Sequence, residues 1–194
     1  MTKRARLLTV LTMSAIVESL QSTRIVSKVI PDGVSKASLI GTHDGSFHCD
    51  EALSCSTLKL LPRYKDATIV RTRNPELLSQ CGIVVDVGAK YDPASHLYDH
   101  HQREFTGVLE GYETKLSSAG LVYKHFGREI ISAILGDKAE PEFVDVCFHK
   151  LYKGFMEHID AIDNGVSIAD GVPLKYHVST SLSARVGTLN PSWN

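Results

Sequence analysis

The stretch from Leu39 to Glu51, Leu-Ile-Gly-Thr-His-Asp-Gly-Ser-Phe-His-Cys-Asp-Glu, decides the fold. Its short apolar run predicts a buried strand over residues 38–40, and Gly41 and Gly45 interrupt that strand. Apolar residues at helical spacing then predict a helix over about residues 50–61. A strand, a glycine-containing turn and a helix in this order place polar side chains at the carboxyl edge of a parallel sheet, where ligands bind in open α/β folds.

This turn contains three side chains that could bind a metal ion: His43, His48 and Asp50. Neutral imidazole together with carboxylate favours Mn, Zn or Fe over Ca. The alternative is a polar loop with surface histidines, and for either histidine alone we would prefer it. Three potential ligands within eight residues favour the metal.

Further strands are predicted over residues 67–71 and 83–87, with a short helical turn over 74–80 between them. Asp86 lies near the carboxyl end of the second of these strands. A carboxylate among valines and isoleucines is costly to bury unless a positive group meets it. Capping of the next turn is the alternative, but the strand-end position favours a role in binding metal or phosphate.

Adjacent histidines follow in the segment His96-Leu-Tyr-Asp-His-His-Gln102. Neighbouring side chains point in divergent directions, so one histidine could bind a metal while the other faces a substrate. A surface loop could also hold them. Ser117 and Ser118 then open a helix that continues through His125. Capping is the default role of such serines, and phosphate binding at the same helix end is the alternative.

A later helix is predicted from a stripe of apolar residues that we expect to face the core: Phe148, Leu151, Phe155, Ile159 and Ile162. Asp160 and Asp163 lie beside this stripe, one turn apart. The carbonyl end of a helix repels anions, so a solvated pair is the ordinary interpretation. A bound cation would remove that repulsion.

Composition narrows the classes of function. The net charge is −1 over 194 residues, so no basic stripe predicts extended nucleic-acid binding, and any nucleic acid would be held locally. The four cysteines form no C-x-x-C pair, as in proteins of reducing compartments. We expect one of them, Cys49, to be a buried packing residue. No apolar run is long enough to predict a membrane span.

The first 33 residues differ from the remainder. Residues 1–31 are rich in Ser and Thr and contain a single acid, Glu18, beside five basic residues: Lys3, Arg4, Arg6, Arg24 and Lys28. This bias predicts a disordered leader for mitochondrial import, with a secretory signal as the alternative. A Pro31–Gly33 breaker cluster suggests that one α/β domain with a mainly parallel sheet occupies residues 34–194.

The candidate ligands converge, because they follow strands whose carboxyl ends share one edge. Alternating carboxylates and imidazoles, with Asp86 able to bridge, suit two metal ions about 4 Å apart. Such a pair activates water and holds a phosphoryl oxygen. The sequence therefore predicts hydrolysis of a phosphate ester.

Five motifs resemble, in order, those of the melanocyte-proliferating-gene-type family: Gly41-Thr-His-Asp-Gly-Ser-Phe-His-Cys-Asp-Glu, Val84-Val-Asp-Val-Gly, Tyr98-Asp-His-His-Gln, Lys115-Leu-Ser-Ser-Ala-Gly and Asp160-Ala-Ile-Asp-Asn-Gly. More broadly, Asp99-His100-His101 with an upstream His-x₄-His-x-Asp resembles the DHH phosphoesterase superfamily. The resemblance implies two divalent ions, manganese first with magnesium or zinc as alternatives. It also implies 3′–5′ exonuclease action on RNA or short oligonucleotides, in the mitochondrial matrix or the nucleus.

The resemblance assigns roles to particular residues. His101 would face the scissile phosphate, and Asp99 would orient the histidines. We also expect three residues to contact substrate phosphates: Ser117, Ser118 and Arg103. The implied metal ligands are His43, His48, Asp50, Asp86, His100 and either Asp160 or Asp163.

Two departures from the pattern matter. The superfamily usually has His-x₃-Asp-x-Asp in the first motif, whereas here His48 stands at the middle carboxylate, which lowers the negative charge and leaves the metal open. The family's chains also continue into a second domain, whereas this one ends at Asn194. We therefore expect a truncated form with weak or no nuclease activity. The alternatives are hydrolysis of a small phosphate ester or pyrophosphate, and a non-catalytic isoform; the oligomeric state stays open.

Overall fold

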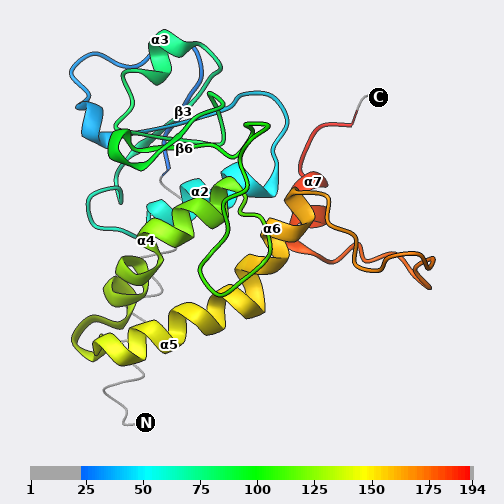
Figure 1. The fold of residues 1–194 in the computed structure, drawn as a ribbon. Helices are drawn as coiled ribbons and strands as arrows, with labels where there is room; N and C mark the ends of the chain where they lie inside the picture. Colours follow the sequence, from blue (N-terminus) through cyan, green and yellow to red (C-terminus); the bar gives the residue numbers. More distant parts are fainter. Residues whose placement is uncertain (1–22, 193–194) are drawn as a thin grey trace.

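The computed structural model describes residues 23–192 and contains a six-stranded sheet in the order β1-β3-β2-β4-β6-β5 (Figure 1). All strand pairs are parallel except β5 with β6. The strands are β1 (Ile25–Val26), β2 (Leu39–Thr42), β3 (Thr68–Arg71), β4 (Ile83–Val85), β5 (Tyr91–Asp92) and β6 (Leu97–Tyr98). The predicted α/β fold with a mainly parallel sheet is confirmed.

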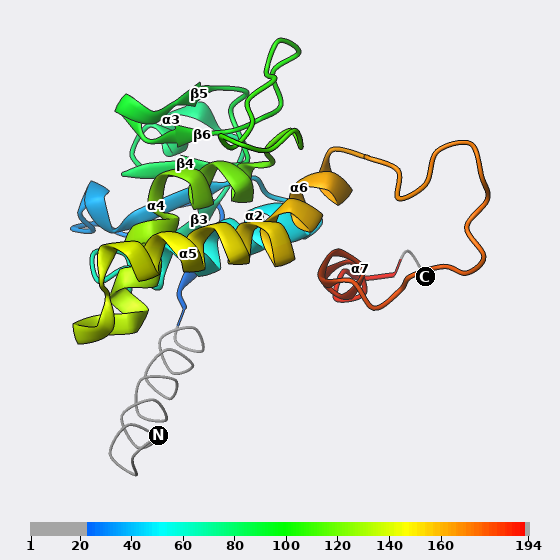
Figure 2. The same cartoon turned by 60° about the horizontal axis from the view of Figure 1, so that its bottom comes forward.

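Helices cover both faces of this sheet. The short α3 lies on one side, and α2 and α4 lie on the other with α5 outside them (Figures 1 and 2). The α-helices are α2 (Cys49–Leu58), α3 (Pro75–Leu78), α4 (Ser118–Leu135), α5 (Pro141–Leu151), α6 (Glu157–Asp163) and α7 (Leu182–Gly187). Short 3₁₀ turns are η1 (Lys36–Ser38), η2 (Pro93–Ser95) and η3 (Gly136–Lys138), and η4 (Tyr152–Met156) is a π-helix.

The strands read as continuous apolar runs because both faces of the sheet are buried. Alternate residues point to opposite faces. Ile40 and Ile83 pack into the larger core beneath α2 and α4, whereas Leu39 and Val84 pack into a smaller core that includes Leu78 of α3. The sheet is therefore held from both sides, which fixes the positions of the loops at its carboxyl edge.

The predicted apolar stripe of the late helix is partly wrong. Phe148 and Ile159 are buried as expected, but Leu151, Phe155 and Ile162 are 47%, 40% and 42% exposed. For Phe155 and Ile162, which lie within and after η4, the cause is that a π-helical turn contains more residues than an α-helical one. Residues spaced by four then face the core instead: Val144, Phe148, Tyr152, Met156 and Asp160.

After α6 the chain leaves the body as an extended segment, and α7 returns toward α2 (Figure 2). At the other end, residues 1–22 lie outside the described residues, so the predicted mitochondrial leader stays a prediction. The sheet begins before the predicted boundary at residue 33, because β1 pairs with β3 through Ile25 and Ile69. Among the described residues, no helix is long and apolar enough to cross a membrane.

Candidate metal centre

The carboxyl ends of three neighbouring strands, β2, β4 and β6, meet at one edge of the sheet. His43 follows β2, Asp86 follows β4, and Asp99 to His101 follow β6. Most of these side chains are buried, although His101 is 60% exposed. The structure therefore places these residues together at one edge of the sheet, and their role as ligands stays a prediction.

One group of possible ligands gathers around His43. Its Nε2 atom lies 3.5 Å from Glu51 Oε2 and 3.6 Å from Asp86 Oδ2. His48 completes a set with His43 and Glu51 whose ligand atoms all lie within 4.8 Å of one another. Glu51 was not anticipated as a ligand. The sequence feature that could have drawn attention to Glu51 is its position three residues after His48. From there its carboxylate accepts the His48 backbone N–H at 2.9 Å and caps α2, which holds it beside His43.

A second group gathers around His100. Its Nε2 atom lies 3.0 Å from Asp163 Oδ2 and 3.6 Å from Asp50 Oδ2. The same nitrogen is 4.0 Å from Asp86 Oδ1, and His101 Nδ1 is 3.5 Å from that oxygen. The two carboxylate oxygens of Asp86 therefore face different groups, Oδ2 toward His43 and Oδ1 toward the adjacent histidines.

The backbone of Asp86 explains how one carboxylate reaches both groups. Strand β4 ends at Val85, and Asp86 has φ 56°, in the left-handed region. A non-glycine residue in this region costs about 1–3 kcal/mol and persists where the surroundings fix it. Here the Ser118 hydroxyl donates to Asp86 Oδ1 at 3.1 Å. The strained turn directs the side chain across the sheet edge.

The donor set fits divalent cations. His43 Nε2 and His100 Nε2 are buried, and neither has a hydrogen-bond partner among the residues that the structure describes. Both nitrogens instead face carboxylates that are themselves buried, on Asp50, Glu51 and Asp86. Uncompensated buried charge is strongly destabilising, and imidazole with carboxylate is a ligand set for Mn, Zn or Fe. A divalent cation between these groups would compensate the charge of the buried carboxylates and would give the two imidazole nitrogens a partner.

The concentration of negative charge also alters proton affinities. Burial raises the pKa of Asp50 well above its usual range, and the charges of Asp86 and Asp163 raise it further. The facing carboxylate of Asp86, and after it that of Glu51, raise the pKa of His43 to about 10. Both shifts show that a positive charge is favoured at this edge of the sheet.

Asp99 holds His101. Its Oδ1 atom lies 2.7 Å from His101 Nδ1 and accepts the His101 backbone N–H at 3.0 Å, and its Oδ2 accepts the Ala89 N–H. This hydrogen bond raises the pKa of His101. Burial alone would raise the pKa of Asp99, but the hydrogen bonds from His101 and Ala89 outweigh it and lower that pKa. The geometry matches the orienting role expected of Asp99.

The structure does not support phosphate binding by Ser117 and Ser118. Both are fully buried at the amino end of α4. The N–H groups expected to meet a phosphate are taken by Asp50, which accepts from Ser118 N at 2.8 Å and from Ala119 N at 2.6 Å. A helix amino end stabilises any nearby anion, and here the anion is a carboxylate of the protein itself.

The two aspartates of α6 separate. Asp163 joins His100 and Asp50, whereas Asp160 is fully buried and absent from every possible ligand group of the described residues. Asp160 Oδ1 accepts the backbone N–H and the hydroxyl of Ser117, both at 2.9 Å, and Oδ2 accepts the Tyr152 hydroxyl at 2.9 Å. Of the two alternatives for the last ligand, the geometry favours Asp163.

A cavity of about 500 Å³ opens onto the centre. Arg103 is exposed and is not among its lining residues. Arg73 lines the cavity instead, with its Nε atom 3.3 Å from Asp44 Oδ1. The lining residues are His43, His48, Arg73, Pro75, Leu78, Asp86, Val87, Gly88, Ala89, Asp99 and His101. The positively charged side chain in the lining of this cavity is therefore Arg73, which lies two residues after β3 and was not predicted from the sequence.

The fold and the site together define an α/β protein with a buried carboxylate–histidine centre at its strand ends. A family profile described as "MYG1_exonuc: Uncharacterised protein family (UPF0160)" matches residues 39–194. The chain belongs to this family, so the predicted family resemblance is confirmed, while placement in the DHH superfamily stays a prediction.

Several curated relatives are similar over 80% of this chain. It is 56% identical to "MYG1 exonuclease" of Mus musculus and 54% identical to "MYG1 exonuclease" of Homo sapiens, each over 162 residues. It is 46% identical to "MYG1 protein YER156C" of Saccharomyces cerevisiae. The chain spans only 42%, 43% and 48% of the lengths of these three proteins. No solved structure matches.

Proposed function

We propose that this chain carries the metal centre of a hydrolase that cleaves phosphodiester bonds in nucleic acid. The observation that carries the proposal is the position of Asp86, whose two oxygens face two separate groups of possible ligands. A carboxylate so placed suits a two-metal site. Relatives named exonucleases support nucleic acid as the substrate class.

His43, His48, Glu51 and Asp86 would hold one divalent ion, and Asp50, Asp86, His100 and Asp163 would hold the other. When bound, such ions lower the pKa of a coordinated water and withdraw charge from a phosphoryl oxygen. Manganese suits these ligands, with magnesium or zinc as alternatives.

His101 and Arg73 would act on the substrate from the cavity wall. Asp99 binds His101 at Nδ1, which leaves Nε2 of the same ring available to hold or donate a proton near the scissile phosphate. Its raised pKa favours the protonated, donating form at neutral pH. The Arg73 guanidinium could bind a neighbouring phosphate, since arginine matches phosphate oxygens with paired N–H groups.

The finer proposal is that the enzyme shortens RNA from its 3′ end. The test incubates the purified chain and its Asp86→Asn variant with Mn²⁺ and three substrates: 5′-labelled RNA, DNA of the same sequence, and pyrophosphate. We expect slow, stepwise shortening of the RNA that requires both Mn²⁺ and Asp86. Turnover of pyrophosphate alone would support the small-phosphate alternative, and turnover independent of Asp86 would contradict the proposed centre.

We also propose mitochondrial import directed by residues 1–31, on the basis of their five basic residues against one acid. Fusing these residues to a fluorescent protein tests the idea. A fusion that stays diffuse in the cytosol, enters the secretory route or collects only in the nucleus would contradict it.

A further inference from the structure

The loop that carries His43 and His48 is fixed by a residue outside the candidate centre. We call residues 43–48, between β2 and α2, the histidine loop. It contains no helix or strand apart from the cap of α2. Arg71 is the last residue of β3 and pairs in register with Thr42, the last residue of β2. Its side chain therefore starts directly beside the loop.

The Arg71 guanidinium binds the carbonyl groups of this loop. Its Nε donates to His43 O at 3.2 Å, and its Nη2 donates to Gly45 O at 3.1 Å. The Cζ atom lies 3.8 Å from the centre of the Phe47 ring, which stacks on the guanidinium. The Arg71 side chain is 11% exposed, so these contacts are largely shielded from water. One side chain thus restrains three residues of the loop.

The same guanidinium reaches a candidate ligand. Its Nη2 atom is 3.7 Å from Glu51 Oε1, while Glu51 Oε2 faces His43 Nε2. Arg71 therefore fixes the loop and the carboxylate relative to each other. A planar guanidinium can make these divergent contacts together, whereas the compact ammonium of lysine cannot.

We propose that Arg71 is a positioning residue of the metal centre, which holds the histidine loop so that His43 and His48 meet Glu51. The inference rests on the proposed metal centre. Arg71 contacts no candidate metal position itself; it acts through backbone carbonyls, a ring and a carboxylate. Groups that orient metal ligands in this way commonly contribute tenfold to a hundredfold to metal affinity.

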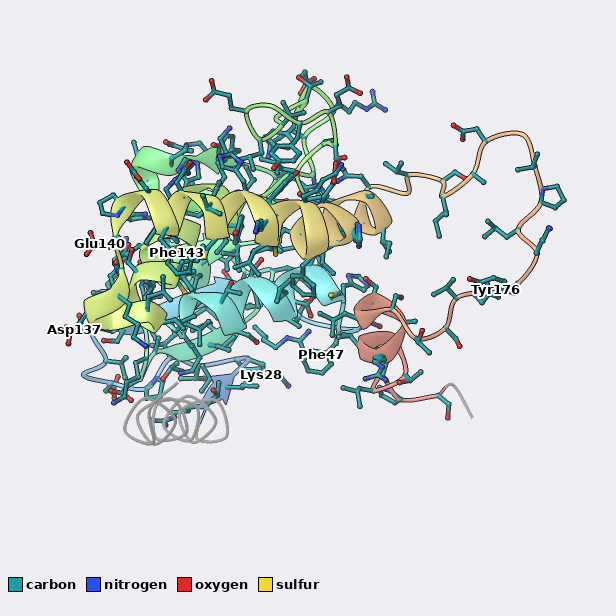
Figure 3. All side chains as sticks on the ribbon, turned by 90° about the horizontal axis from the view of Figure 1, so that it is seen from below. Lys28, Phe47, Asp137, Glu140, Phe143 and Tyr176 are labelled. Carbon is teal, nitrogen blue, oxygen red and sulfur yellow. The ribbon has the colours of Figure 1, made fainter. Side chains whose placement is uncertain are left out.

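The loop is also held from its opposite side. Phe47 N donates to Asn190 Oδ1 at 2.6 Å, and Asn190 Nδ2 donates to Phe47 O at 2.8 Å. Figure 3 shows Phe47 beside α7, after which Asn190 follows in the chain. Phe47 thus receives restraint from β3 and from the C-terminal segment, so the conformation of the histidine loop depends on residues far from it in sequence.

Arg128 provides a matched control. Its Cζ atom lies 3.8 Å from the centre of the Phe148 ring, and its Nε and Nη2 donate to Asp145 Oδ1 at 3.0 and 2.6 Å. It therefore makes the same kinds of contact as Arg71, an aromatic stack and an ion pair, between α4 and α5 and outside the candidate centre. Arg128→Lys should perturb these contacts without altering the histidine loop.

The experiment titrates Mn²⁺ into the whole chain by calorimetry and follows the bound ion by electron paramagnetic resonance. We expect Arg71→Lys to weaken Mn²⁺ binding about tenfold to a hundredfold and to alter the spectrum of the bound ion. Arg128→Lys should leave both unchanged. Amide exchange should become faster in residues 43–48 of Arg71→Lys and stay as in the parent elsewhere.

Unchanged Mn²⁺ affinity and spectrum in Arg71→Lys would overturn the inference while leaving the metal centre intact. A parent chain that binds no divalent ion would overturn both the inference and the proposed centre. Arg71→Ala is the more severe variant, and Arg71→Lys supplies the decisive measurement if Arg71→Ala does not fold.

Discussion

Two regions of the described structure bury carboxylates, and they differ in the groups that surround those carboxylates. At the junction between α4 and α6, three hydrogen bonds from Ser117 and Tyr152 satisfy Asp160. At the sheet edge, Asp50, Glu51 and Asp86 surround two imidazole nitrogens that lack a hydrogen-bond partner among the described residues. Both regions exclude water, so burial alone does not distinguish them.

The difference lies in what completes each region. The junction is complete within the chain, because every Asp160 oxygen has a donor and Gly120 leaves room for the carboxylate, where a Cβ atom would collide with it. At the sheet edge Arg71 pairs with Glu51, but among the described residues no arginine or lysine pairs with Asp50 or Asp86. A buried carboxylate that faces only hydrogen-bond donors is therefore structural, whereas one that also faces an unpartnered imidazole, as Asp50 does, is a candidate ligand.

The largest expected effect tests the sheet edge. Asp86→Asn should reduce metal-dependent hydrolysis to background, because the variant loses the charge shared by both ligand groups. The fold should persist, since asparagine tolerates the left-handed conformation and Ser118 can still donate to it. Turnover and metal content are measured together with the melting temperature. A variant that retains parental turnover with full metal occupancy would contradict the comparison.

The second prediction uses pH to test the junction. Burial raises the pKa of Asp160 from its ordinary 3.8 to about 6. Between these two values the folded chain binds more protons than the unfolded chain, so stability falls as the pH rises through this window. The shift corresponds to about 3 kcal/mol.

Asp160→Asn should lack this part of the pH dependence. The measurement is the free energy of unfolding by urea at pH 4.5 and pH 7.5, with a chelator present, for both proteins. Asp50 contributes in the same direction to both, so the difference between them isolates Asp160. Parallel pH profiles would show that Asp160 does not titrate in this range.

The third prediction separates the two aspartates of α6. Asp163→Asn should weaken Mn²⁺ binding about tenfold to a hundredfold, because it neutralises a carboxylate 3.0 Å from His100. Its effect on unfolding should be small, since its side chain is 24% exposed. Asp160→Asn is the control and should leave Mn²⁺ binding unchanged. The opposite assignment of effects would exchange the roles of the two residues.

The smallest effect is expected at Tyr152. Tyr152→Phe removes one donor to the Asp160 carboxylate and should destabilise the fold by about 1.5–3 kcal/mol, the usual contribution of a hydrogen bond to a charged group. Its ring packing is retained, so Mn²⁺ affinity should not change. Chemical unfolding and calorimetry on the same sample provide the check, and a loss of Mn²⁺ binding would mean that the junction also supports the metal centre.

Short-range patterns in the sequence were sufficient for the sheet and for most of the centre. Apolar runs identified β2, β3 and β4, and parallel strands necessarily bring His43, Asp86 and His100 to one edge. These inferences depend only on continuous apolar runs and on strand direction. They succeed because both faces of the sheet are buried.

Long-range contacts account for what the sequence did not reveal. The N–H groups at the start of α4 are taken by Asp50, which lies 68 residues earlier. Glu51 was not predicted as a ligand, and Arg73 reaches the cavity only because β3 lies beside β2. Regular α-helical spacing could not decide between Asp160 and Asp163, because the π-helix before them changes which side chains face the core.

That π-helix sets the phase of everything that follows it. An α-helix advances 100° per residue. A π-helix advances less per residue, so an α-helix over residues 152–156 would rotate each later residue by about one position, into the place of the residue after it. Ile159 would then lie where Asp160 meets the Ser117 N–H, and Ile162 would take the place of Asp163 beside His100. The extra residue of the π-helical turn thus decides which side chains of α6 face their partners, and a further insertion within residues 152–156 would be far less tolerated than a substitution there.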